Sequence, residues 1–139
     1  MVDTARCLFC RIVDGDAPAF EVMRTETVVA FLDIRPVFPG HTLVVPVEHV
    51  DTLGDLEPGR LADYFGEVQR LARAIPAVLG SQGTWVSINN VVSQSVPHLH
   101  THVVPRTKGD GLRGFFWPRT RYADGEAAQI AERVRTAVG

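Results

Sequence analysis

Short runs of apolar and β-branched residues, separated by polar or proline-containing segments, recur along most of the chain and predict β-strands. Each run is long enough for a strand and too short for a helix. The polar residues 24–27 between the first two runs favour a hairpin, and Pro97 and Pro105 limit the last run. The predicted strands are residues 20–23, 28–32, 42–47, 84–88 and 99–104.

Spacings of three and four between apolar residues predict two helices in other parts of the chain. Residues 58–79 carry one apolar stripe, with Asp55 as a candidate cap at the start and Gly80 at the end. Pro76 lacks a backbone donor, so we expect a kink or an earlier end of this helix. The second helix is predicted in the tail. Its apolar side comprises Ala127, Ile130, Ala131, Val134 and Val138.

Five strands with hairpin-like connections and two main helices predict an α+β fold, in which the helices cover one face of an antiparallel sheet. A chain of 139 residues can bury one core, so residues 1–139 are expected to form a single domain. The net charge of −2 gives no general attraction for nucleic acid or an acidic membrane, and neither is expected as a partner. No apolar run resembles a signal segment or a membrane span, which predicts a cytoplasmic protein.

Histidines supply the first candidate chemistry. His98, His100 and His102 alternate along one predicted strand, while His41 and His49 flank another. Residues two apart in a strand point to the same face, about 6.8 Å from one another, so three imidazoles are expected to share one surface. Two chemistries fit such a row. It can bind zinc, although no nearby Asp or Glu completes the ligand set, or it can supply a nucleophilic imidazole, for which phosphorus is a suitable electrophile.

Residues 94–106, Gln-Ser-Val-Pro-His-Leu-His-Thr-His-Val-Val-Pro-Arg, resemble the signature of the histidine-triad (HIT) superfamily, and specifically of its nucleoside phosphoramidase-like branch. In that signature three histidines alternate with apolar residues. Further segments similar to the family stand in the same order, at residues 7–12, 30–36, 39–46 and 49–50. The resemblance covers residues 7–106 and includes all five histidines. Residues 107–139 remain as a C-terminal extension and helix.

The resemblance implies an enzyme in which His100 attacks the α-phosphorus of a purine nucleotide conjugate and carries the nucleotidyl group. The backbone carbonyl of His98 then holds the other ring nitrogen of His100, which keeps the attacking lone pair available. His102 is implied as a catalytic and phosphate-binding side chain. His41 is implied behind the triad, where it supports orientation or proton transfer.

The resemblance also implies the substrate contacts. Asp33 matches the carboxylate that accepts the ribose hydroxyls, and Gln94 and Ser95 match a loop that binds phosphate. Two departures from the family pattern affect this region. The loop 89–94 is shorter than usual, so either Asn89 or Asn90 is the phosphate contact, with Asn90 our choice, and Thr101 replaces an apolar residue.

The extension at residues 108–119 is longer than the usual spacing before a tryptophan of the family. We expect Trp117 to approach a substrate site, and the aromatic segment 115–117 to reach the neighbouring subunit. The resemblance implies a homodimer with a two-fold axis. The long helix and an exposed sheet edge would form its interface, joining two sheets into one.

Cys7 and Cys10 form a C-x-x-C pair, which on its own is compatible with metal binding, redox chemistry or simple burial. Some members of the superfamily hold a structural zinc with such a pair, and the matching ligands here are Cys7, Cys10, His49 and His98. A redox role needs a thioredoxin-like βαβ setting, whereas this pair precedes a run of hairpins. Assigning His98 to zinc leaves His100 free to attack.

The leaving group stays open at this point. An amine, as in adenosine phosphoramidates, and a polyphosphate, as in dinucleoside polyphosphates, share the same nucleophile. Transfer of the nucleotidyl group to phosphate is a third outcome, because phosphate can replace water in the second step. A nucleotide-binding regulatory protein with little turnover would keep the same pocket.

Overall fold

The computed structural model describes residues 7–112 and 119–139, and its sheet agrees with the predicted α+β class. Five antiparallel strands lie in the order β1-β2-β3-β5-β4. The strands are β1 Glu21–Arg24, β2 Val28–Leu32, β3 Thr42–Pro46, β4 Gly83–Ile88 and β5 Thr101–Arg106. The helices are α1 Leu8–Val13, α2 Leu61–Leu79 and α3 Glu126–Val138, with 3-10 turns at Leu53–Asp55 and Pro58–Arg60.

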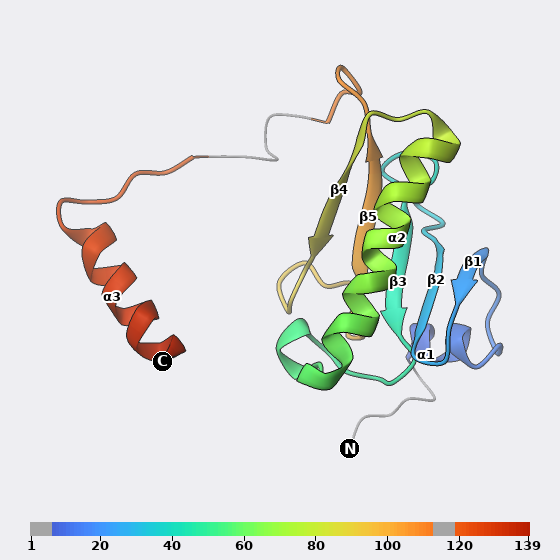
Figure 1. Ribbon diagram of the computed structural model, residues 1–139, viewed down its shortest axis with the longest axis horizontal. Helices are drawn as coiled ribbons and strands as arrows, with labels where there is room; N and C mark the ends of the chain where they lie inside the picture. The colour runs from blue at the N-terminus through green and yellow to red at the C-terminus, as the bar shows by residue number, and fades with distance from the viewer. Residues whose placement is uncertain (1–6, 113–118) are drawn as a thin grey trace. The chain divides into compact units, whose positions relative to one another are not determined.

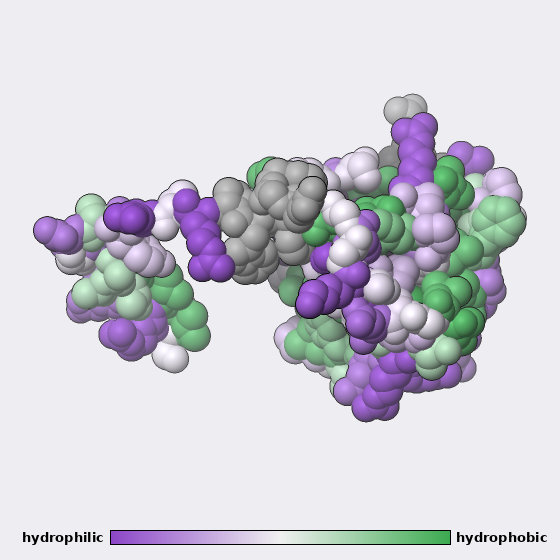
Figure 2. Space-filling view, turned by 90° about the horizontal axis from the view of Figure 1, so that it is seen from above, coloured by the Kyte–Doolittle hydropathy of each residue, from purple (hydrophilic) through white to green (hydrophobic). Residues whose placement is uncertain are grey.

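The chain divides into two compact units, Met1–Lys108 and Gly109–Gly139. The first unit holds the sheet with α1 and α2, and the second holds α3. This boundary lies close to residue 106, where the family resemblance ends. On the face shown in Figure 2, hydrophilic and apolar residues are interspersed over both units. Among the described residues, no helix is both long enough and apolar enough to cross a membrane.

Alternation along the strands gives the sheet two covered faces. Helix α2 lies along one face (Figure 1), where Tyr64 and Val68 pack against Val44 and Val103. The strand residues that alternate with these point to the other face of the sheet, where they pack with α1. That second cluster is formed by Phe9, Val13, Val29, Phe31, Leu43 and Val45. The sequence predicted helical cover on one face only, because α1 is too short to show a helical period.

The last strand begins two residues later than predicted and continues through Pro105. His98 and His100 therefore precede β5, and only His102 belongs to it. The segment before β5 is hydrogen-bonded to Val50 instead of to a neighbouring strand, because the backbone N–H of Leu99 donates to the Val50 carbonyl at 2.7 Å.

Helix α2 ends as predicted but starts differently. Gly80 adopts a left-handed φ of 71° after the last turn, which glycine tolerates without steric cost. The expectation of an earlier end at Pro76 was wrong, because the helix continues to Leu79 and only one backbone donor is lost. Asp55 is not its cap either. The Asp55 carboxylate accepts from the Thr52 backbone and hydroxyl, in the preceding 3-10 turn.

Thr101 has a structural explanation. Its hydroxyl oxygen lies 2.7 Å from the hydroxyl of Tyr64, which also donates to the carbonyl of Val44 at 2.7 Å. Both side chains are buried, that of Tyr64 on α2 and that of Thr101 on β5. A buried hydroxyl is tolerated when it is hydrogen-bonded, so Tyr64 supplies the partner that an apolar residue at position 101 would not need.

Candidate functional site

The triad side chains share one face, as the alternation predicted. Leu99 and Val103 pack in the cluster under α2, and the rings of His98 and His100 instead contact Phe9 of α1. The ring centroids of His100 and His102 lie 5.1 Å apart. The three imidazoles therefore lie on the α1 side of the sheet.

A backbone carbonyl orients His100. Its Nδ1 lies 2.8 Å from the carbonyl oxygen of His98, which only accepts hydrogen bonds. We infer from this partner that Nδ1 carries the ring proton and that Nε2 keeps its lone pair. The ring is buried, with 4% of the residue exposed, so few competing orientations are open to it.

The tautomers of His41 and His102 follow from a second backbone group. The N–H of Val37 donates to Nδ1 of His41 at 3.0 Å, which leaves the His41 proton on Nε2. That nitrogen lies 2.9 Å from Nδ1 of His102 and donates to it. The proton of neutral His102 is therefore on Nε2. Within the described residues this buried nitrogen has no hydrogen-bond partner.

Burial keeps this pair neutral at pH 7. Desolvation, aided by the neighbouring His100 and His41, lowers the pKa of His102 to about 4. Desolvation also lowers the pKa of His41, against the opposing attraction of the Asp33 carboxylate. A neutral His41–His102 pair keeps the tautomers described above, so the site presents an N–H donor on His102.

Asp33 lies beside this pair. One carboxylate oxygen accepts from the backbone N–H of Arg35 at 2.8 Å, and the other lies 3.7 Å from Nε2 of His41. Asp33, His41 and His102 offer ligand atoms within 4.8 Å of one another, as a metal site requires. The tautomer of His41 does not suit a metal ligand, because its Nε2 carries a hydrogen instead of a free lone pair. This cluster is better matched to a polar ligand.

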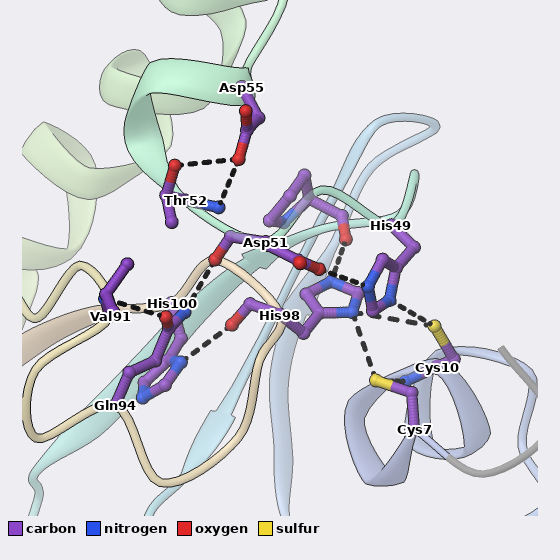
Figure 3. A network of polar contacts seen from close by, with 11 residues as sticks. Cys7, Cys10, His49, Asp51, Thr52, Asp55, Val91, Gln94, His98 and His100 are labelled. Atoms are coloured by element: carbon purple, nitrogen blue, oxygen red, sulfur yellow. Dashed lines mark hydrogen bonds and ion pairs between the residues drawn. The ribbon is translucent and has the colours of Figure 1, made fainter. Parts of the chain in front are cut away.

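The four predicted zinc ligands do come together (Figure 3). Sγ of Cys10 lies 3.1 Å from Nδ1 of His49 and 3.5 Å from Nδ1 of His98, and Sγ of Cys7 lies 3.5 Å from the same His98 nitrogen. All four ligand atoms lie within 4.8 Å of one another. A tetrahedral zinc with two sulfur and two nitrogen ligands separates sulfur from nitrogen by about 3.6 Å. The donor set therefore fits zinc in type and spacing.

The surroundings of the two histidine ligands also suit a metal. Nε2 of His98 lies 2.9 Å from the carbonyl of Pro46, and Nε2 of His49 lies 2.9 Å from a carboxylate oxygen of Asp51. Both partners accept a proton, which leaves each Nδ1 lone pair directed to the cysteines. Burial and the neighbouring Cys7 raise the pKa of Cys10 to about 12, so its thiolate needs a cation for stabilisation.

The loop 89–95 is fastened by the amide side chains that were predicted to bind phosphate. The Asn90 oxygen accepts from the N–H of Leu53 at 2.9 Å. The Gln94 oxygen accepts from Val91 N–H at 3.0 Å, and its nitrogen donates to the Asp51 carbonyl at 2.5 Å (Figure 3). These contacts hold the loop to the segment that follows His49. Val91 has a left-handed φ of 69°, a strained conformation for a β-branched residue.

Ser95, another predicted substrate contact, is exposed in the same loop. Trp117 and the aromatic segment 115–117 lie outside the described residues. Sequence reasoning missed Asp51, Phe9 and the Val37 amide. Asp51 stands two residues after a predicted ligand, which is a usable signal. The other two contacts depend on tertiary structure alone.

The family follows from comparison with known proteins. The HIT domain model matches residues 14–109, so the chain belongs to the HIT family. The adenosine 5'-monophosphoramidase of Schizosaccharomyces pombe is 32% identical over 134 residues, covering 95% of this chain and 98% of that protein.

Two further relatives differ in what their names describe. The asymmetrical bis(5'-nucleosyl)-tetraphosphatase of S. pombe is 38% identical over 89 residues, which cover 63% of this chain and 49% of that protein. A zinc-bound histidine triad family protein of Mycobacterium smegmatis is 36% identical, with a TM-score of 0.74 and coverage of 94% of this chain and 99% of that one. The predicted family and fold class are thereby confirmed.

Proposed function

We propose that the protein is a nucleotide hydrolase that cleaves purine nucleotide conjugates at the α-phosphorus through a nucleotidyl intermediate on His100. The observation that carries the proposal is the fixed tautomer of His100, whose Nδ1 is held by the His98 carbonyl at 2.8 Å. The free Nε2 lone pair is the nucleophile. The names of the S. pombe relatives support a hydrolase of nucleotide conjugates.

The reaction proceeds in two displacements. Nε2 of His100 bonds to the α-phosphorus while the bond from phosphorus to the leaving group breaks with its electron pair, and the leaving amine takes up a proton from solvent. Water then attacks the same phosphorus and gives up a proton to solvent. The bond to Nε2 breaks, and AMP leaves with one oxygen from water. The Nε2–H of His102 donates to the phosphate oxygens during both steps, which stabilises the developing negative charge. Its lack of a partner within the described protein supports this role.

The other side chains bind and orient. Asp33, whose side chain is 22% exposed beside His41, accepts the ribose hydroxyls. His41 is a positioning residue, because it holds His102 in the donor tautomer. Gln94, Ser95 and Asn90 shape the phosphate loop, which the hydrogen-bonded amides of Gln94 and Asn90 fasten in place. Trp117 is proposed to contact substrate.

A structural zinc is proposed at Cys7, Cys10, His49 and His98, supported by the ligand spacing and by the zinc-bound M. smegmatis relative. When bound, the ion would stabilise the thiolates and link α1 to the segments around His49 and His98. It takes no part in the two displacements. Its ligand His98 also supplies the carbonyl that orients His100.

We place the phosphoramidate first among substrates, because the phosphoramidase relative matches almost the whole chain whereas the tetraphosphatase match covers about half of that protein.

We also propose a homodimer. Strand β4 is a terminal strand of the sheet, and Leu61 and Phe65 of α2 are partly exposed. A symmetric partner would cover both features. Light scattering at micromolar concentration tests the dimer, and a monomer would contradict it.

A substrate panel tests the function. Purified protein is incubated with adenosine 5'-phosphoramidate, diadenosine triphosphate or diadenosine tetraphosphate, and release of AMP is compared with that of His100→Gly. We expect the phosphoramidate to turn over fastest and the variant to bind AMP without turnover. Formation of ADP from the phosphoramidate on addition of phosphate would indicate a transferase. Retained AMP binding without wild-type turnover on any substrate would indicate a regulatory protein and contradict the hydrolase.

A further inference from the structure

The short helix α1 carries an aromatic ring that lies directly against the predicted nucleophile. The centroid of Phe9 is 5.0 Å from that of His100, and the two planes are nearly perpendicular at 88°. Phe9 also contacts His98, with centroids 6.0 Å apart at 71°. It is 5% exposed, so this ring is a fixed part of the core.

The Phe9 ring also packs against the sheet. Phe31 of β2 packs on it with centroids 5.3 Å apart and an angle of 69°. Cys7 and Cys10 flank Phe9 in the sequence, and their sulfur atoms lie in the cluster with His98. The helix that provides half of the cysteine and histidine cluster therefore also fixes the ring that contacts His100.

A single hydrogen bond leaves an imidazole incompletely fixed. The bond from Nδ1 of His100 to the His98 carbonyl holds one ring atom, whereas an edge-to-face contact restricts the plane of the ring. Together the two contacts restrict the direction of the Nε2 lone pair.

We propose that Phe9 is a positioning residue, which holds His100 in a single tautomer and orientation for attack on phosphorus. The inference rests on the proposed function for its kinetic consequence but not for its structural one. Removing the ring should slow the chemical step and leave substrate affinity nearly unchanged.

The test compares Phe9→Leu with Phe31→Leu. Phe31 is a matched control, because it is 3% exposed in the same cluster and its ring contact in the described part of the chain is with Phe9. We expect kcat to fall about five- to tenfold in Phe9→Leu with KM changed less than twofold. Phe31→Leu should keep kcat within about twofold of the wild type at a similar cost in stability. Phe9→Met, whose flexible unbranched side chain can adapt to the space of the ring, replaces Phe9→Leu if the latter does not fold.

Nitrogen chemical shifts of the imidazoles supply a second readout. Those of His100 should indicate one tautomer in the wild type and Phe31→Leu, and averaging between two tautomers in Phe9→Leu. Equal kcat in the two leucine variants, an unaveraged tautomer in Phe9→Leu, or loss of bound zinc from that variant alone would each overturn the inference. If the wild type itself hydrolyses no nucleotide, the proposed function fails and the tautomer measurement still decides the role of Phe9.

Discussion

Nε2 of His41 lies 2.9 Å from Nδ1 of His102, and this contact determines which nitrogen of His102 carries its proton. His41 is itself set by the Val37 amide at 3.0 Å. A backbone N–H therefore acts through one histidine to present an N–H donor on the next.

Replacing His41 tests this arrangement. His41→Ala should lower kcat about ten- to a hundredfold with a smaller change in KM, because His102 then populates both tautomers. His41→Gln should recover part of the rate, since its side-chain amide nitrogen can donate near the position of Nε2. Steady-state kinetics of both variants are the measurement. Equal rates for the alanine and glutamine variants would show that the donor to His102 is unimportant.

Metal binding should depend on both cysteines. Protein purified without chelators is expected to contain about one zinc per chain, and Cys7→Ser or Cys10→Ser should lose it together with thermal stability. Asp51→Asn is a milder comparison, because it alters only the partner of His49 and should weaken zinc binding about ten- to a hundredfold. Metal analysis and thermal unfolding give the result. The zinc site would be refuted if the purified protein contained no zinc and a chelator changed neither its melting temperature nor its activity.

Stability should fall on acidification because the partly buried His102 ring is held neutral in the folded protein. Its pKa is lowered from 6.5 to about 4 in the folded protein. Between pH 6.5 and about 4, the His102 ring binds a proton in the unfolded chain but not in the folded chain. The free energy of unfolding is therefore highest above pH 6.5 and decreases as the pH falls to about 4. After allowance for solvent screening we expect about 1–2 kcal/mol from this ring.

Urea unfolding at pH 7.5 and 4.5 measures this effect. The loss of stability on acidification should be smaller in His102→Asn than in the wild type by that amount. Comparing the variant with the wild type removes the contributions of other groups, including His98. An unchanged pH dependence in the variant would exclude His102 as the source.

The buried hydroxyl pair should be energetically coupled. Tyr64→Phe and Thr101→Val each remove one side of a 2.7 Å contact, and each should cost about 1–2 kcal/mol in free energy of unfolding. The double variant should cost less than the sum by about 1 kcal/mol, because the contact between the two hydroxyls can be lost only once. Urea denaturation of the four proteins completes the cycle. Additive costs would mean that the two hydroxyls do not depend on each other.

Local pattern was sufficient for much of the fold. Runs of β-branched residues predicted five strands, and the three-and-four spacing predicted α2 and α3, because these periods follow directly from backbone geometry. The alternation of His98, His100 and His102 correctly placed their side chains on one face. The family resemblance led to four ligands for zinc, which the structure brings within 4.8 Å of one another.

Other features required the tertiary structure, because they join groups far apart in the sequence. Helix α1 has six residues, too few to show a period, and its Phe9 meets His100 only after folding. The start of β5 was misplaced since Leu99 pairs with Val50 instead of continuing a strand pattern. Sequence alone established that five imidazoles were available. Their individual protons were set by the groups opposite each ring nitrogen: the carbonyls of His98 and Pro46, the amide of Val37, the Asp51 carboxylate and His41.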